Sequence, residues 1–503
     1  MSKWSVLILS AFAMMGGATA AHAEGKFTPG ACPKMPTAIA ELATAKCGRL
    51  TVPENRAHPN GKTISLSVAI IPAKSATPKP DPIVWLAGGP GDDAVTEIPM
   101  ALAGDLNSDR DLIFMSQRGT YSAQPNLLCP SVDRAGADTL NVPYDSRQAQ
   151  ILTLRAHATC HREVVARGAD VPAYNTIESS ADLEDLRLAL GIPKWNLYGI
   201  SYGTDFALTY MRLYPQGLRS VGIDGVFPPS TGGGAAGWTA SEGFKAVFAA
   251  CSAQPKCRAR YGDVDALFRR LVVQYERHPK TFLVKVDGQP APVKVMISGG
   301  MLVQWAATPG THLAAQVPAA LNELAHGRPD RITKLWATSR LDPNSVGITS
   351  PGLFNSIACS EWVPFETKAQ VIAAGRKAFP DFPRSVHANA PMNQFLHETC
   401  TVWPVPPAPA SVRDVVRSNI PTLVVNAQYD AQTAPSNGAL VAKTLPNAVV
   451  VTIPNVAHVA FASPSPAANA CAQQIARSFF DTLQNADTSC VAKVPPTDFV
   501  IDP

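Results

Sequence analysis

Residues 195–203 read WNLYGISYG, a short apolar run that breaks into the pattern G-x-S-x-G. This pattern places Ser201 on a sharp turn between a strand and a helix, with its hydroxyl exposed at the end of a buried sheet. Gly199 and Gly203 suit the turn, because a side chain at either position would meet the neighbouring backbone. Apolar residues at helical spacing follow over 206–213. The sequence therefore predicts a strand, a tight turn and a helix in succession.

Apolar runs elsewhere in the chain alternate with helical patterns in the same way. One helix, carrying Leu183 and Leu186, leads into the strand before Ser201. Continuous apolar strands that alternate with amphipathic helices indicate an α/β fold with a mostly parallel sheet and helices on both faces. The strands are predicted at 62–71, 82–86, 111–115, 195–200, 221–226, 421–425 and 449–453.

The stretch from 230 to 410 interrupts this alternation. It opens with three glycines at 232–234, closes with the proline-rich run 404–409, and contains mostly helical patterns between them. We expect a cap domain inserted between two strands of the sheet. The predicted division is a signal peptide at 1–23, a first core segment at 24–229, a cap at 230–410, and a second core segment at 411–503 that supplies an acid and a histidine.

The first 23 residues have the pattern of a secretory signal. Lys3 provides the positive end, residues 6–15 are nearly all apolar, and Ala21-His22-Ala23 forms a small-x-small cleavage site. The apolar stretch is short and rich in Gly and Ala, which argues against a stable membrane span. We therefore expect an exported protein, in the periplasm or outside the cell.

Composition favours a large globular core: hydrophobic residues make up 46% of the chain and charged residues 16%. The formal net charge of +4 is close to balance and argues against nucleic acid as a partner. A monomer is expected.

Ten cysteines in an exported chain predict disulfides. An even number does not fix their connectivity, but the spacing suggests local pairs. The chain has no C-x-x-C pair and no H-E-x-x-H motif, so neither a metal site nor a cofactor is expected. The suggested pairs are Cys32–Cys47, Cys129–Cys160, Cys251–Cys257, Cys359–Cys400 and Cys471–Cys490.

A serine hydroxyl is a poor nucleophile until a base takes its proton, so Ser201 needs a histidine and an orienting acid. Asp430 follows the strand predicted at 421–425, and His458 follows the next strand. Asp430 alone would suit an Asx turn, and His458 alone would suit an ordinary surface or core position. Together with Ser201, however, they stand in the order serine, acid, histidine. Asp224 is the fallback acid, although its glycine neighbours indicate a structural turn.

The oxyanion formed during acyl transfer needs backbone N–H donors. One is expected from Tyr202, directly after the nucleophile. The other is expected from the glycine-rich loop after the strand at 82–86, where Gly89 is the first choice and Gly88 the reserve. In isolation this loop would be an ordinary tight turn.

Several motifs together carry a family resemblance. They are Gly88-Gly89-Pro90-Gly91, Gln117-Arg118-Gly119-Thr120, Gly199 to Thr204, Asp430, His458, residues 47–53 and residues 400–404. With these motifs the chain resembles the α/β-hydrolase family of prolyl aminopeptidases, and within it the secreted tripeptidyl-aminopeptidase branch with its TAP-like carboxyl-terminal region. The resemblance covers nearly all of the mature chain and is thin inside the cap.

The chain departs from the family pattern in two places, and the family supplies one further expectation. Ser116 stands where an aspartate is usual, and Tyr121 where glycine is common, which puts substrate preference in doubt. Family aminopeptidases hold the free ammonium of the substrate with carboxylates from the cap. Glu361 and Glu398 are the candidates, although either could equally be a solvated surface charge.

Three functions are compatible with these features. The first is a secreted serine exopeptidase that releases tripeptides or proline from free peptide N-termini. The second is a carboxylesterase that uses the same triad on small or lipid-like esters. The third is a binding protein without activity on the same scaffold, which the intact set of Ser201, Asp430 and His458 argues against. The expected partner is thus a peptide or small ester substrate.

Overall fold

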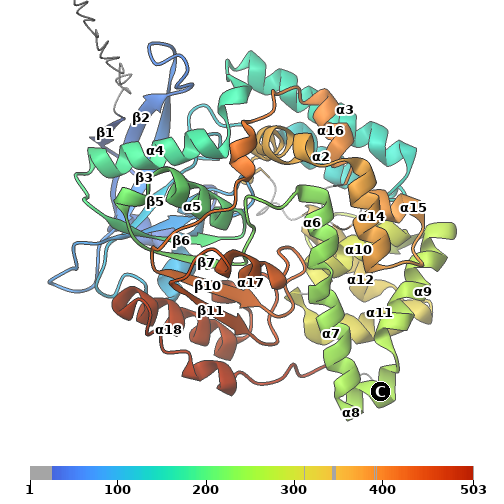
Figure 1. Ribbon diagram of the computed structural model, residues 1–503. Coiled ribbons are helices and arrows are strands. Elements are labelled where there is room, and N and C mark those ends of the chain that lie inside the picture. The colour runs from blue at the N-terminus through green and yellow to red at the C-terminus, as the bar shows by residue number, and fades with distance from the viewer. Residues whose placement is uncertain (1–24, 311, 342–346, 390, 392–393, 502–503) are drawn as a thin grey trace, which may run out of the picture.

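The computed structural model describes residues 25–310, 312–341, 347–389, 391 and 394–501. The predicted signal peptide at 1–23 lies outside these residues. A nine-stranded sheet runs through the left half of the molecule in Figure 1, in the order β1-β2-β3-β5-β4-β6-β7-β10-β11. Its strands are β1 (Lys26–Pro29), β2 (Lys46–Pro53), β3 (Thr63–Ile71), β4 (Ile83–Leu86), β5 (Leu112–Met115), β6 (Trp195–Ile200), β7 (Leu218–Asp224), β10 (Thr422–Ala427) and β11 (Ala448–Ile453).

The sheet is parallel where the candidate catalytic residues emerge. Strands β5, β4, β6, β7, β10 and β11 run parallel, whereas β1, β2 and β3 add an antiparallel edge. The α/β class and the mostly parallel sheet are thus confirmed. All seven predicted strands are present within a few residues of their expected bounds, and β1 and β2 come in addition. The strand β2 contains the sequence motif at 47–53 and is mostly buried between β1 and β3.

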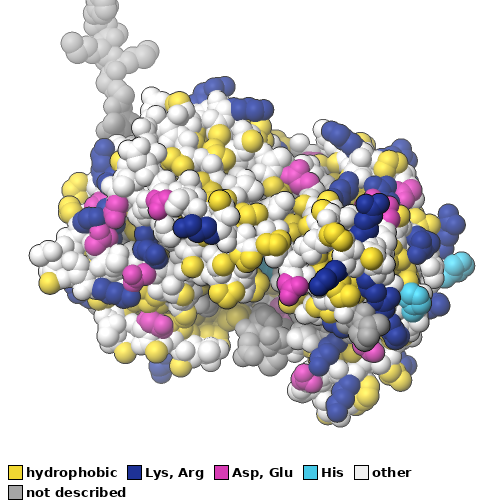
Figure 2. All heavy atoms as spheres, turned by 90° about the horizontal axis from the view of Figure 1, so that it is seen from below, with side chains coloured by type: hydrophobic (Ala, Val, Ile, Leu, Met, Phe, Trp, Pro, Cys, Tyr) yellow, Lys and Arg dark blue, Asp and Glu magenta, His cyan; other side chains and the backbone are white. Residues whose placement is uncertain are grey.

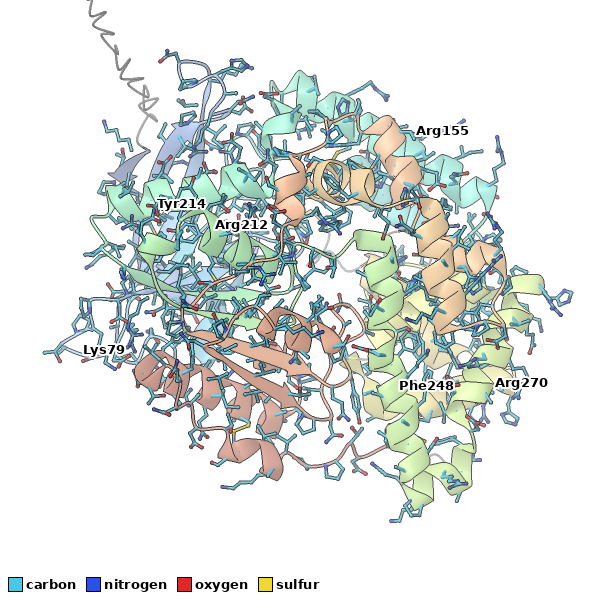
Figure 3. All side chains as sticks on the ribbon, in the orientation of Figure 1. Lys79, Arg155, Arg212, Tyr214, Phe248 and Arg270 are labelled. Atoms are coloured by element: carbon cyan, nitrogen blue, oxygen red, sulfur yellow. A yellow bond between two sulfur atoms is a disulfide. The ribbon has the colours of Figure 1, made fainter. Side chains whose placement is uncertain are left out.

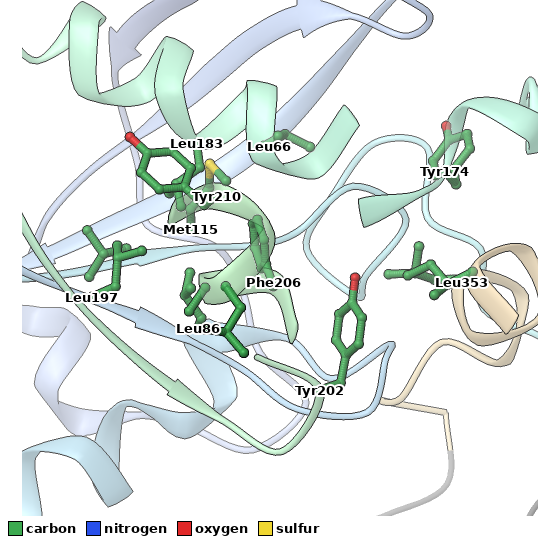
Figure 4. Close-up of a cluster of buried hydrophobic side chains, with 14 of the residues drawn as sticks. Leu66, Leu86, Met115, Tyr174, Leu183, Leu197, Tyr202, Phe206, Tyr210 and Leu353 are labelled. Carbon is green, nitrogen blue, oxygen red and sulfur yellow. The ribbon is translucent and has the colours of Figure 1, made fainter. Parts of the chain in front are cut away.

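Helices cover both faces of the sheet because its central strands are apolar on both sides. Val84 and Leu86 of β4 belong to the buried cluster under α4 (Thr176–Ala189) and α5 (Tyr202–Leu213), which Figure 4 shows in close-up. Trp85, between them, faces the other cluster with α18 (Pro466–Thr482) and stacks on Tyr198 with ring centroids 5.2 Å apart.

A mainly helical segment connects the end of β7 to the start of β10 and forms the right half of the molecule in Figure 1. It also contains a hairpin of β8 (Lys280–Val284) and β9 (Val293–Ile297), which the sequence did not predict. Its helices are α6 (Gly233–Ala240), α7 (Glu242–Ala253), α8 (Pro255–Tyr261), α9 (Val264–Arg277), α10 (Gly299–Trp305), α11 (Val317–Ala325), α12 (Asp330–Leu341), α13 (Pro351–Ile357), α14 (Lys368–Ala378), α15 (Arg384–Asn389) and α16 (Leu396–Val402). We call this segment the insertion.

The insertion has a hydrophobic core of its own. Phe379 stacks on Phe382 with centroids 4.6 Å apart, and Phe244 and Phe268 pack against them. Phe248 lies among the same helices, whereas Arg270 of α9 extends into solvent (Figure 3).

Segments that precede and follow the insertion in the sequence also pack into its hydrophobic core. Leu140 and Tyr144, which lie between α2 (Pro130–Asp138) and α3 (Arg147–Ala166), belong to its buried cluster, and so does Phe499 near the carboxyl end. Tyr429 and Ala431, which follow β10, belong to it as well, so the helical half of the molecule is assembled from four stretches of sequence. Such packing fixes the insertion against the sheet on more than one side.

Disulfides join the five cysteine pairs that the spacing suggested. Cys359–Cys400 connects the segment after α13 to α16, and Cys471–Cys490 ties α18 to the carboxyl-terminal residues. Within the described residues, no helix combines the length and the apolar character needed to cross a bilayer.

Candidate active site

The turn between β6 and α5 has the strained geometry that its sequence predicts. Ser201 adopts φ +53° and ψ −125°, a backbone conformation that non-glycine residues rarely occupy. A Cβ at Gly199 would lie 2.3 Å from the carbonyl oxygen of Gly203, and one at Gly203 would lie 2.2 Å from the carbonyl oxygen of Leu86. Both contacts are too close for any side chain. Only glycine allows the turn to close here.

Neighbouring strands hold this turn in place. The N–H of Ser201 donates to the carbonyl of Asp224 at the end of β7. The Oγ1 of Thr204 donates to the carbonyl of Ser201 at 2.6 Å and accepts the N–H of Phe227 at 2.8 Å. The serine therefore stands on a rigid support at the carboxyl edge of the sheet.

The structure brings Asp430 and His458 together. The Oδ2 of Asp430 accepts a bond from Nδ1 of His458 at 2.8 Å. Oδ1 accepts the N–H groups of Gln432 and Thr433, so Asp430 also forms the Asx turn that a lone aspartate suggests. The hydroxyl of Thr433 donates to Oδ2 at 2.7 Å. This network fixes the carboxylate and, through it, the imidazole.

Asp224, the fallback acid, has different partners. Its carboxylate accepts the N–H groups of Ala460 and Phe461, at 3.1 and 2.8 Å. These bonds anchor the loop after His458. Burial raises the pKa of Asp224 to about 6, although the two N–H groups oppose the shift. Asp224 therefore supports the histidine loop, and Asp430 makes the direct contact.

His458 lies next to the nucleophile turn. A Cβ at Gly225, the residue after Asp224, would lie 3.0 Å from Cε1 of the His458 ring. Ser201 and Thr433 line the same cavity. Burial alone would lower the pKa of His458, but the charge and hydrogen bond of Asp430 outweigh it and raise this pKa above the ordinary histidine value. Asp224 and Asp92 act in the same direction.

Both glycines considered for the oxyanion site lie near the nucleophile. A Cβ at Gly88 would lie 3.1 Å from the Cβ of Ser201. Gly89, with φ +105°, lines the cavity together with Ser201 and Tyr202. Gly89 stays the predicted partner of the Tyr202 amide, with Gly88 as the reserve.

Ser116 explains one departure from the family pattern. Its hydroxyl donates to Oδ1 of Asp93 at 2.8 Å, and the N–H of Ser122 donates to Oδ2. An aspartate at position 116 would set two buried carboxylates about 3 Å apart, which like charges disfavour. In this chain, the buried carboxylate at this place belongs to Asp93, and Ser116 donates a hydrogen bond to it.

The cavity at the nucleophile is small and largely apolar. Its volume is about 60 Å³, and its walls come from both halves of the molecule. Tyr202, whose ring stands between α5 and Leu353 of α13 in Figure 4, forms one wall. Phe227, Phe354 and Trp362 supply aromatic surface that the sequence had not singled out. Such walls suit a short apolar acyl group.

Glu361 is buried directly behind this cavity. Its oxygens accept the N–H and the hydroxyl of Thr176 at 2.7 and 2.6 Å, and Tyr202 donates to that hydroxyl at 2.8 Å. Burial raises the pKa of Glu361 to about 7, against the bonds from Thr176. Its neighbour Trp362 lines the cavity.

Glu398, the other candidate carboxylate, lies on α16 and forms an ion pair with Lys368 at the start of α14. It is not among the residues that line the cavity.

Thr433 and Asp92 were not predicted from the sequence as residues of the site. Thr433 follows Asp430 by three residues, and this D-x-x-T spacing is a local signal that could have been noticed. Asp92 accepts a bond from Thr349 of the insertion at 2.9 Å, and burial raises its pKa. In the part of the chain that is described, no three His, Cys, Asp or Glu side chains gather where they could hold a metal ion.

Comparison with known proteins agrees with this geometry. A family model described as TAP-like protein matches residues 386–490, which contain Asp430 and His458. Serine protease Hip1 of Mycobacterium tuberculosis is 25% identical over 419 residues, or 80% of this chain and 79% of that protein. Tripeptidyl aminopeptidase of Streptomyces coelicolor is 29% identical over 195 residues, or 37% of this chain and 36% of that protein. The chain has the α/β-hydrolase fold, and its residues 386–490 match the TAP-like family model.

Solved α/β hydrolases also match. Proline iminopeptidase of Mycobacterium smegmatis aligns over 87% of this chain and 98% of that chain, with 13% identity and a TM-score of 0.38. The sheet order, the strained serine turn and the relatives together make this α/β hydrolase a serine hydrolase.

Proposed function

We propose that this α/β hydrolase is an exported serine exopeptidase that releases proline or short peptides, including tripeptides, from free peptide N-termini. The Asp430–His458 bond beside the strained turn of Ser201 carries the proposal, because it supplies an oriented base at an exposed nucleophile. The relatives named as a serine protease and a tripeptidyl aminopeptidase favour peptides as substrates.

In the proposed reaction, His458 takes the proton of Ser201 as its oxygen attacks the carbonyl carbon of the scissile amide. The N–H groups of Tyr202 and Gly89 stabilise the oxyanion. His458 then gives the proton to the leaving amine, the C–N bond breaks, and an acyl-enzyme remains on Ser201. Water, activated by the same histidine, releases the acyl group.

Residues 230–410 act in this proposal as a cap that selects the substrate. Phe354 and Trp362 come from this segment and suit a proline ring or another apolar side chain. Glu361 is the proposed partner of the substrate ammonium, because it lies directly behind Tyr202 and its neighbour Trp362 faces the cavity. Opening of the Thr176 contacts would then let its carboxylate reach an amine.

Export is supported by five disulfides, which persist in oxidising compartments. The signal-like pattern of residues 1–23 points in the same direction.

A panel of substrates tests the proposal. Free-amine prolyl and tripeptidyl amides should be cleaved much faster than their N-acetyl counterparts, and Ser201→Ala should abolish both rates while the protein remains folded. Fast turnover of short-chain nitrophenyl esters, with equal rates on free and acetylated amides, would contradict the peptidase assignment and favour a carboxylesterase.

A further inference from the structure

Two cavities lie near the catalytic groups, one lined by Ser201 and the other by Ala457, the residue before His458. The small cavity described above lies on the side of Ser201 and is lined in part by the insertion. A second, open groove of about 360 Å³ lies on the side of His458, and its wall includes Ala457, the residue directly before the histidine. Figure 2 views the molecule from below, the side on which α18 and α8 lie in Figure 1.

The groove is built from three separated parts of the chain: the histidine loop at 455–457, the segment 312–316 of the insertion, and a carboxyl-terminal strap at 495–498. The strap is held at both ends. Nδ2 of Asn455 donates to the carbonyl of Pro495 at 3.1 Å, and the N–H of Val500 donates to the carbonyl of Ala315 at 2.9 Å. The groove is therefore a fixed feature between the two lobes.

Side chains that border the groove suit an extended peptide better than a charged small molecule. Pro464, Pro495 and Pro496 give it rigid apolar walls, and Asp498 is exposed at the rim. His312 of the insertion also lines the groove and is exposed to solvent. The groove thus runs along the loop that carries the catalytic histidine, with Ala457 in its wall.

Acyl transfer splits the substrate at the scissile bond into an acyl part and a leaving amine. The acyl part stays bonded to Ser201, whereas the amine that leaves receives its proton from His458 and so departs past the imidazole. The cavity beside Ser201, at about 60 Å³, is much smaller than the groove, at about 360 Å³, so the groove has more room for the leaving part than the cavity has for the acyl part.

We propose that the groove binds the first residues of the leaving peptide, so that the enzyme cleaves polypeptide chains more efficiently than dipeptides or small amides. This inference rests on the proposed exopeptidase function and assigns its substrate class. Contacts in the groove act during acylation, when the leaving peptide is still attached. Binding energy remote from the scissile bond then raises the specificity constant for long substrates.

The test compares substrates that share one acyl group and differ only in the leaving group, from a nitroanilide to peptides of increasing length. In the wild-type enzyme, kcat/KM should rise with the length of the leaving peptide. Ser465→Trp fills the groove from the core side, and Ala315→Trp fills it from the insertion. Each should lower kcat/KM for the long peptide about tenfold and change that for the nitroanilide less than about twofold.

Ala470→Trp is the matched control, because Ala470 is exposed on α18, the helix that Ser465 precedes, and lies outside the groove lining. It should leave both rates unchanged. Equal losses on both substrates in Ser465→Trp and Ala315→Trp, or no dependence on leaving-group length, would overturn the groove assignment while leaving the exopeptidase in place. Cleavage of esters without cleavage of any peptide would instead overturn the proposed function, and the groove assignment with it.

Discussion

The edge of the sheet and the insertion contribute to this enzyme in different ways. Ser201, Asp430 and His458 lie in loops that directly follow β6, β10 and β11, so each is placed by the strand before it. Phe354 and Trp362 come from the insertion and reach the cavity only because distant helices pack together. The comparison indicates that reaction chemistry depends on local chain geometry, whereas substrate choice depends on long-range packing.

The largest expected effect is on kcat, and it distinguishes Asp430 from Asp224 at the carboxyl edge of the sheet. Asp430→Asn removes the acceptor that orients His458 and should lower kcat about 10³–10⁴-fold. Asp224→Asn disturbs only the anchoring of residues 460–461 and should cost far less in kcat, with a loss of about 1–3 kcal/mol in the free energy of unfolding. Steady-state kinetics and denaturant unfolding measure the two quantities. The opposite ranking in kcat would make Asp224 the catalytic acid.

A smaller effect is expected in the insertion. If Glu361 binds the substrate ammonium, Glu361→Gln should reduce the preference for free-amine over N-acetyl peptides roughly a hundredfold, because a buried charge pair is lost. Glu398→Gln is the matched control, since Glu398 already pairs with Lys368, and it should leave the preference unchanged. The assignment is wrong if the two variants behave alike or if Glu398→Gln has the larger effect.

The pH dependence of kcat/KM tests the pair of Asp430 and His458 at the carboxyl edge of the sheet. Only neutral His458 can act as the base, and its pKa is raised by Asp430. Below this pKa, kcat/KM should therefore fall about tenfold per pH unit, starting from a pH above the ordinary histidine value of about 6.5. Asp430→Asn should move this acid limb to lower pH. An acid limb that stays in place in the variant would contradict the role of Asp430.

Two disulfides within the insertion test its stability. Cys359 and Cys400 are 41 residues apart, and Cys251 and Cys257 are 6 apart. In the chain-entropy model, replacing both cysteines by serine should cost about 4 kcal/mol for the longer loop and about 2 kcal/mol for the shorter one. Denaturant unfolding of the two double variants gives these values. Equal losses would show that loop length does not govern the stabilisation.

Sequence predicted the parts of the molecule that local pattern determines. The apolar strands and the glycines around Ser201 have physical signatures within a few residues, and the structure has them where expected. The five cysteine pairs are close in sequence and could be suggested from spacing.

The insertion was harder to predict because its features depend on distant contacts. The β8–β9 hairpin lies in a stretch that otherwise has helical patterns. Cavity residues such as Phe227 and Trp362 look like ordinary core residues in the sequence. Tyr144 and Phe499 pack with the insertion although they lie far outside residues 230–410. The environment of Glu361 could not be predicted, because it depends on Thr176, which is 185 residues away along the chain.

Covalent trapping of the nucleophile tests the central claim most directly. A fluorophosphonate should modify the folded protein once, and peptide mass spectrometry should locate the adduct on Ser201. His458→Ala should slow this modification by at least about 10³-fold, because the serine loses its base. An adduct on another serine, or an unchanged rate in His458→Ala, would contradict the account.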